Sequence, residues 1–139
     1  MRKDKKLKIR TATMDDLEMI AAVEAECFPA AEAATREEFA KRLQHYSDHF
    51  WLMFEGEKLI AFVDGFVTDE ADLTDEMYEK AELHNEHGAW QMIFGVNTIP
   101  ACRRHGYAGE LICRAIQDAK KQGRKGLVLT CKDLSLIHI

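Results

Sequence analysis

Thr98-Ile99-Pro100-Ala101-Cys102-Arg103-Arg104-His105-Gly106-Tyr107-Ala108-Gly109 is the stretch that decides the fold of this 139-residue chain. Through the pattern Arg103-x-x-Gly106-x-Ala108, it joins an apolar segment of strand length to a long amphipathic segment. The first N–H groups of a helix lack intrahelical partners and lie at the positive end of the helix dipole, so such a strand–loop–helix unit suits an anion. Gly106 tolerates unusual dihedral angles, and Arg103 and Arg104 add positive charge. The stretch therefore predicts a pyrophosphate-binding loop.

This loop differs from two common phosphate-binding sequences, because the chain contains neither GK[ST] nor GxGxxG. The pattern is short, so an ordinary loop with solvated arginines before a surface helix is the alternative interpretation. The apolar strand that precedes the loop, Pro100, and the long amphipathic helix after it favour the anion site.

Length and composition indicate one globular domain over residues 1–139, since 47% of the residues are apolar. No apolar run approaches the ~18 residues of a membrane span, and the basic N-terminus lacks the apolar stretch of a signal peptide. We therefore expect a cytoplasmic protein without a membrane partner. A net charge of −5 argues against nucleic-acid binding. The cysteines form no CxxC pair, which predicts reduced thiols and no metal; they are Cys27, Cys102, Cys113 and Cys131.

Periodicity predicts the order β-α-α-β-β-(α)-β-α-β, an α/β domain with a mixed sheet. Asp15 is expected to cap the first helix, and Thr35 with Glu38 forms a capping box for the second. A hairpin of buried strands is expected over 50–67, and a single strand over 90–98. The other expected elements are a strand at 7–13, helices at 74–83 and 107–122, and a strand at 127–129.

With its Arg-x-x-Gly-x-Ala motif and this element order, the chain resembles the GNAT acyltransferase superfamily from Leu7 to Asp133. Short pieces such as Ala61-Phe62-Val63-Asp64-Gly65 and Cys27-Phe28-Pro29 resemble its arylalkylamine N-acetyltransferase-like branch. The resemblance implies a mixed, mostly antiparallel sheet flanked by helices. It also implies an acetyl-CoA-dependent N-acetyltransferase of the 2.3.1 class, in which a small primary amine attacks the thioester directly.

The resemblance assigns cofactor-binding residues. In the family, the matching loop holds the CoA pyrophosphate, and a strand that carries a bulge pairs with the pantetheine arm. A free N–H on that strand polarises the thioester carbonyl. The residues of this chain that match are Arg103, Arg104, His105, Gly106, Tyr107 and Ala108 in the loop, and Val96, Asn97 and Thr98 on the strand.

The catalytic residues depart from the family pattern. Vertebrate-type relatives use two histidines where this chain has Met92 and Phe94, and neither can accept a proton. Glu32, which resembles a glutamate of insect-type relatives, is our first candidate for the base; the alternative is a solvent-facing glutamate. His84 is the second candidate, and the alternative is a solvated loop histidine.

The C-terminal part departs as well. The family continues with another helix and two more strands, and that helix carries a tyrosine that protonates the CoA thiolate; this chain has no tyrosine after Tyr107. We expect a C-terminally truncated domain, with residues 134–139 as a non-native tail. An exposed sheet edge would favour self-association. Whether such a chain is active is left open, so a non-catalytic CoA-binding or interaction module and a peptide or protein N-acetyltransferase are alternative functions.

Overall fold

The computed structural model describes residues 6–130 and 136–138, and one cysteine of the sequence analysis, Cys131, lies outside them. Four α-helices occur in this part of the chain: α1 (Leu17–Cys27), α2 (Arg36–Tyr46), α3 (Asp75–Glu79) and α4 (Tyr107–Lys121). Its strands are β1 (Leu7–Thr11), β2 (Phe50–Glu55), β3 (Lys58–Asp64), β4 (Val67–Thr68), β5 (Trp90–Met92), β6 (Gly95–Thr98), β7 (Gly126–Thr130) and β8 (Leu136–His138).

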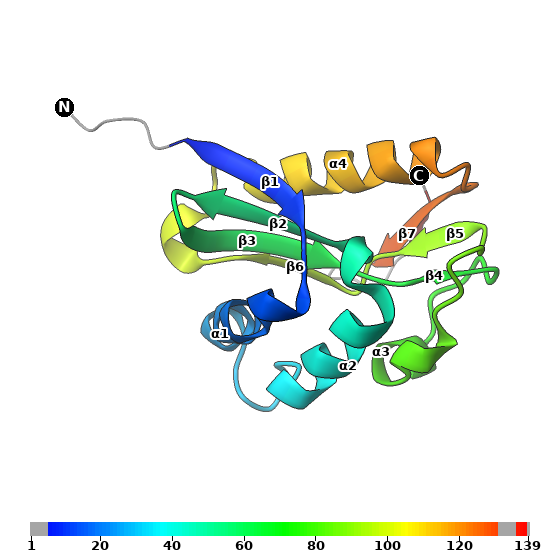
Figure 1. Ribbon diagram of the computed structural model, residues 1–139, viewed down its shortest axis with the longest axis horizontal. Coiled ribbons are helices and arrows are strands. Elements are labelled where there is room, and N and C mark those ends of the chain that lie inside the picture. Colours follow the sequence, from blue (N-terminus) through cyan, green and yellow to red (C-terminus); the bar gives the residue numbers. More distant parts are fainter. Residues whose placement is uncertain (1–5, 131–135, 139) are drawn as a thin grey trace.

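The strands form two four-stranded sheets, in the orders β1-β2-β3-β6 and β4-β5-β7-β8. Every pairing is antiparallel except that of β5 with β7. Helices α1 and α2 lie on one side of the strands, and α4 lies on the other (Figure 1). The predicted α/β fold, with a mixed and mostly antiparallel sheet flanked by helices, is confirmed.

The segment expected to be one strand, residues 90–98, is two strands that belong to different sheets. The chain bends at the two residues between β5 and β6, where the Ile93 N–H donates to Val128 O (2.8 Å) and the Phe94 N–H donates to Asp64 O (2.7 Å). Beside this bend, Gly65 packs so closely that a Cβ built on it would overlap the Met92 carbonyl. The bend therefore directs β5 to β7 and leaves β6 as the edge strand of the first sheet.

Local sequence signals explain most helix boundaries. The capping box of Thr35 and Glu38 is present at the start of α2. Asp15 as the cap of α1 was wrong: a 3₁₀ turn, η1 (Met14–Asp16), comes first, and Thr13 caps it through a capping box with Asp16. The predicted helix over 74–83 consists of the short α3 and a 3₁₀ turn, η3 (Ala81–Leu83). Helix α4 ends before Gly123, whose φ is +77°.

The apolar hairpin supplies the centre of the core. Its large aromatic side chains are almost fully inaccessible to solvent, as expected for strands covered on both faces; they include Phe50, Trp51, Phe62 and Phe66. Helix α4 covers one side of these strands with Leu111 and Ala115. Asp118 of the same helix accepts a hydrogen bond from the Trp51 indole (2.7 Å). This contact helps to fix α4, and with it the loop at its N-terminus.

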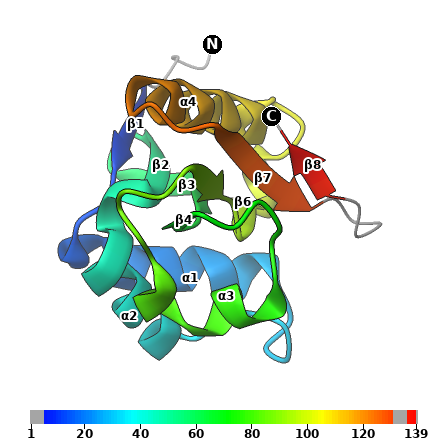
Figure 2. The same ribbon diagram turned by 90° about the vertical axis from the view of Figure 1, so that its right-hand side faces the viewer.

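Part of the expected non-native tail is a strand that the sequence did not predict. Residues Leu136–His138 form β8, which pairs antiparallel with β7 along its outer edge (Figure 2). Residues 131–135 and 139 of this region lie outside the described part. None of the helices in residues 6–130 combines the length and apolar content required to cross a bilayer.

Candidate active site

The loop before α4 has the backbone geometry of an anion-binding turn. Arg104 and Gly106 both adopt positive φ, at 69° and 77°, and Gly106 is the N-cap of α4. Alternation of left-handed and ordinary residues turns successive N–H groups toward one side. The Glu110 N–H donates to Gly106 O (3.1 Å) as the first bond of the helix, so the N–H groups of residues 107–109 have no intrahelical acceptor. The loop can therefore donate several hydrogen bonds to one anion.

The side chains of this loop fix it to β6 and leave charge in solvent. Arg103 Nε donates to Thr98 O at the end of β6 (3.0 Å). Arg104 and His105 are exposed, and the His105 ring stacks on Tyr107 with ring centres 5.3 Å apart. A Cβ on Gly106 would meet no atom within 4 Å. Its left-handed backbone is therefore the reason for glycine at this position, rather than crowding.

A trough of about 560 Å³ runs from β6 to this loop. Eight of the nine residues expected to bind the cofactor line it, and His105 alone among the nine does not. The other lining residues include Cys27 and Phe28, at the end of α1. Cys27 is half-buried, its thiol donates to Thr98 O (3.3 Å), and burial raises its pKa. A protonated thiol of this kind is a wall of the trough rather than a nucleophile.

The backbone of β6 presents an open edge to the trough. The Ile99 N–H donates to Ile60 O (3.0 Å), and the antiparallel register pairs Asn97 with Phe62. Alternate residues of such a strand point to opposite edges, so the N–H and C=O of Val96 point away from β3. An extended ligand with amide groups can therefore pair with β6 as another strand would.

A second cavity, of about 510 Å³, adjoins the trough where β5 and β6 separate. The two share Phe28, and Gly95 of this cavity precedes Val96 of the trough. We call it the acidic cavity, because its lining includes one guanidinium, that of Arg42, and five carboxylates: Glu24, Glu32, Glu38, Asp64 and Glu79. Phe94 forms an apolar part of its wall. Met92, the other residue in a family histidine position, is fully buried.

Glu24 joins the two cavities structurally. Its side chain is buried, and both carboxylate oxygens accept hydrogen bonds: one from Asn97 Nδ2 (2.6 Å), the other from the Ala34 N–H (2.8 Å). The loop between α1 and α2 is thereby held against β6. Glu32, the first candidate base, lies exposed in this loop, at the solvent side of the acidic cavity.

Asp64 is a buried carboxylate of the acidic cavity that the sequence analysis did not single out. Arg42 Nη1 donates to its Oδ2 (3.1 Å), and both side chains are buried. Burial raises the pKa of Asp64 to about 6, although the Arg42 guanidinium acts in the opposite direction. Its signal in the sequence was a charged residue that ends an apolar strand without a charged neighbour.

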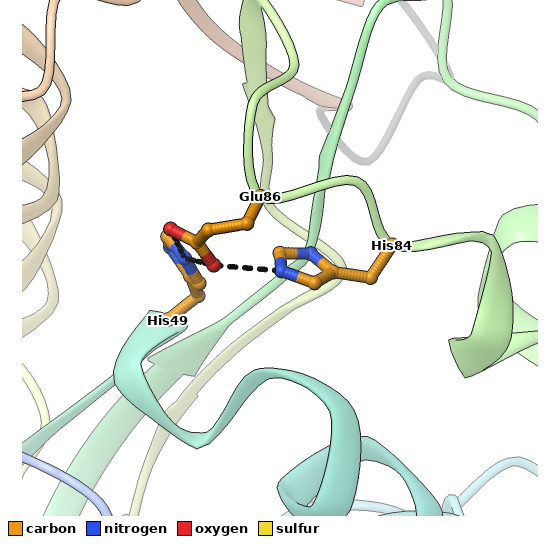
Figure 3. Close-up of side chains that lie close together, drawn as sticks. All are labelled: His49, His84 and Glu86. Carbon is orange, nitrogen blue, oxygen red and sulfur yellow. Dashed lines mark hydrogen bonds and ion pairs between the residues drawn. The ribbon is translucent and has the colours of Figure 1, made fainter.

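His84, the second candidate base, lines neither cavity among the described residues. It belongs to a cluster with His49 and Glu86, in which the Glu86 carboxylate lies between the two imidazole rings (Figure 3). Nε2 of His84 lies 2.9 Å from Glu86 Oε1, and its Nδ1 accepts from the Val67 N–H (3.0 Å). Nδ1 therefore carries the lone pair and Nε2 carries the proton.

His49, the other imidazole of the cluster, is fully buried. Gln91 Nε2 lies 2.7, 3.3 and 2.8 Å from three backbone carbonyl oxygens, which share its two hydrogens, so its Oε1 faces His49 Nδ1 (2.8 Å) and accepts a hydrogen bond from it. His49 Nε2 lies 3.0 and 3.1 Å from the two Glu86 oxygens. Arg124 Nη2 also donates to Glu86 Oε2 (3.0 Å). The possible ligand atoms of His49, His84 and Glu86 all lie within 4.8 Å of one another, and each of the three residues has a hydrogen-bond partner in the protein.

The divided sheet, the anion-binding loop and the open edge of β6 thus lie together in one domain. The family model described as "Acetyltransferase (GNAT) family" matches residues 17–136. The chain belongs to this family. No curated protein matches the sequence.

Solved structures share the fold. The loading GNATL domain of CurA from Lyngbya majuscula superposes with a TM-score of 0.81 at 18% identity, over 92% of this chain and 67% of that one. The GphF GNAT-like decarboxylase, solved with isobutyryl-CoA, gives 0.78 at 26% identity, over 91% and 67%. The ribosomal-protein-S18-alanine N-acetyltransferase from Escherichia coli gives 0.65 at 17% identity, over 89% and 66%. The chain thus spans about two thirds of the length of these proteins.

Proposed function

We propose that this protein transfers an acetyl group from acetyl-CoA to a small primary amine, by direct attack of the amine on the thioester. One observation carries the proposal: an acidic cavity opens beside the cofactor trough, where β5 and β6 separate. The two reactants would thus approach β6 from adjoining spaces. Holding reactants in this way replaces a collision in solution by a reaction between bound groups.

The residues of the trough fit acetyl-CoA. The left-handed loop from Arg103 to Gly106 and the free N–H groups of α4 would hold the pyrophosphate. The open edge of β6 would pair with the amides of the pantetheine arm. The Val96 N–H, on that edge, is the donor that can stabilise negative charge on the thioester oxygen.

The acidic cavity supports an amine as the acceptor. Its five carboxylates outnumber its one guanidinium, so the cavity attracts a cation and disfavours an anion. A volume of about 510 Å³ lies within the range of small-molecule sites, which favours a small amine over a folded protein. Phe94 and Phe28 offer apolar surface to the carbon skeleton of the amine.

Two other functions have some support. Met92 and Phe94 stand where relatives have catalytic histidines, which favours a CoA-binding module without turnover. One structure with this fold is named a ribosomal-protein-S18-alanine N-acetyltransferase, and an N-terminal peptide also presents an amine. The name of GphF raises decarboxylation, but a carboxylated acyl group would meet the carboxylates of the acidic cavity.

The release of CoA thiol from acetyl-CoA, measured with a panel of acceptors, separates these functions. The panel contains 2-phenylethylamine, tyramine, spermidine and an alanine-terminated peptide. Incubation of malonyl-CoA without acceptor tests decarboxylation through the formation of acetyl-CoA and CO₂. We expect release with at least one small amine and little with the peptide. Retained acetyl-CoA binding without release would support the binding module and contradict the proposal.

A further inference from the structure

The five carboxylates of the acidic cavity differ in their capacity to accept a proton. Both oxygens of Glu24 already accept hydrogen bonds. Glu38 accepts the Thr35 N–H in the capping box. Glu32 and Glu79 are exposed to solvent. Asp64 is buried on β3 and pairs with Gly95 of β6. We call this point the junction, because Gly95 lines the acidic cavity and the next residue, Val96, lines the trough.

The carboxylate of Asp64 lies between Arg42 and the glycine at the junction. Its Oδ2 is bound to Arg42, and its Oδ1 faces Gly95. A Cβ on Gly95 would lie 3.0 Å from Oδ1. Because Gly95 has no side chain, no Cβ stands beside Oδ1 at this point of the cavity wall.

The protonation equilibrium of Asp64 also suits a base. Desolvation disfavours the charged carboxylate and, together with the nearby Glu24 carboxylate of α1, raises the pKa of Asp64 to about 6. Arg42 of α2 acts in the opposite direction and still allows Asp64 to ionise near neutral pH, and Tyr46 of α2 is the other titratable group that interacts with it. A general base works best when its pKa lies near the working pH. A buried carboxylate beside a cavity with such a pKa is a candidate for catalysis on physical grounds.

We propose that Asp64 takes the proton from the acceptor amine, with Gly95 providing its access and Arg42 holding the carboxylate in place. This inference rests on the proposed function. Glu32, at the exposed side of the cavity, would then attract and orient the amine rather than deprotonate it.

The proposed reaction moves two protons and one acetyl group. An ammonium ion transfers one proton to Asp64, which passes it to water. The neutral nitrogen attacks the thioester carbon, so a C–N bond forms and the C–S bond breaks. The electron pair of the C–S bond leaves with sulfur, and the second proton of the nitrogen ends on the CoA thiol. No oxidant, reductant or metal is required.

The test is the pH dependence of kcat/KM in Asp64→Asn, with Asp15→Asn as a matched control, because Asp15 is exposed and lines neither cavity. In the wild type we expect kcat/KM to fall on the acidic side of about pH 6. Asp64→Asn should lower kcat at pH 7 by about 10²-fold or more and remove this acidic limb, with acetyl-CoA affinity unchanged. Asp15→Asn should keep the limb.

Gly95→Ala covers the case in which Asp64→Asn does not fold. It keeps the pair of Asp64 and Arg42, but its methyl group would lie beside Oδ1 at the junction, so amine turnover should fall about tenfold or more with acetyl-CoA affinity within twofold of the wild type. If the wild type acetylates amines and either Asp64→Asn or Gly95→Ala does so at the wild-type rate, the role of Asp64 is overturned while the proposed function stands. A wild type that binds acetyl-CoA but acetylates no amine would overturn the proposed function as well.

Discussion

Replacing Gly65 with alanine would test the packing that divides the sheet. A Cβ at this position would overlap the Met92 carbonyl and lie 2.7 Å from the Cα of Ile93. Both neighbours are backbone atoms, so no side-chain rotation relieves the overlap, and β5 must move away from the end of β3. Forcing one methylene into a packed interior costs about 1–3 kcal/mol. Because backbone must shift here, we expect Gly65→Ala to lose about 3 kcal/mol or more of unfolding free energy.

Thermal and urea unfolding, followed by circular dichroism, measure this loss. For a domain of this size, about 3 kcal/mol corresponds to a decrease in Tm of roughly 10 °C. Gly109→Ala is the matched control, since a Cβ on Gly109 meets no atom within 4 Å and the residue lies in the first turn of α4. The control should gain up to about 1 kcal/mol, because alanine is the better helix former.

Gly65→Ala also tests the proposed acetyl-CoA site. Displacement of β5 changes the bend at Ile93 and Phe94, so Gly65→Ala should weaken acetyl-CoA binding in addition to stability. An unfolding free energy of Gly65→Ala within about 0.5 kcal/mol of the wild type would refute the reasoning. It would show that Gly65 does not pack against the Met92 carbonyl. The packing of Gly65 would then not explain why β5 and β6 separate.

Three further predictions follow from the contacts of single residues. Arg104→Ala should weaken acetyl-CoA binding about tenfold by calorimetry, since charge-assisted bonds to phosphate contribute about 1.5–3 kcal/mol. Arg114→Ala is the control, because Arg114 is exposed further along α4, and it should leave the affinity unchanged. Equal effects of the two substitutions would contradict a localised pyrophosphate site. The raised pKa of Asp64 means that the native state binds more protons than the unfolded state between about pH 4 and pH 6, so this residue makes stability fall as pH rises through that window. Urea unfolding of Asp64→Asn should lack this component, and an identical pH profile would count against the buried, paired aspartate. Addition of Zn²⁺ should leave the Tm unchanged, because His84 and Glu86 are already hydrogen-bonded to the Val67 N–H and to Arg124; a rise in Tm that a chelator reverses would show metal binding by the cluster.

The fold could be predicted largely from local signals. The capping box of Thr35 and Glu38, the turn at Gly56 and the apolar face of α4 are each encoded within a few residues of one another, and the structure has all three. The loop from Arg103 to Gly106 was predicted in the same way, because the unusual dihedral angles belong to the loop itself.

What the sequence did not show depends on contacts between distant residues. Residues 90–98 carry no proline or charge to mark a break, and the bend arises from the approach of Gly65 and from a hydrogen bond to Asp64. Asp64 was noted as part of an apolar strand and of a stretch that resembles the family, but its burial with Arg42 was not predicted, because the two residues are 22 positions apart. The strand β8 likewise depends on pairing with β7, and its own sequence has no strand signal longer than three residues.

The surroundings of His84 also depend on distant residues. In the sequence it was a polar residue in a loop, which made it a candidate base or a solvated histidine. The structure instead packs its ring against Tyr46, with centroids 5.4 Å apart, and burial lowers its pKa. The contact with Tyr46 joins segments far apart in the chain, so no local pattern could have indicated it.

Transfer of the acetyl group itself is the most direct test of the account. The protein is incubated with acetyl-CoA and the best amine of the panel, and the acetylated amine and free CoA thiol are quantified together by mass spectrometry and thiol titration. We expect the two products in equal amounts, and both to fall about 10²-fold or more in Asp64→Asn. Acetyl-CoA binding without an acetylated amine, or CoA release without the matching product, would contradict the assignment of the trough and the acidic cavity as the two halves of one active site.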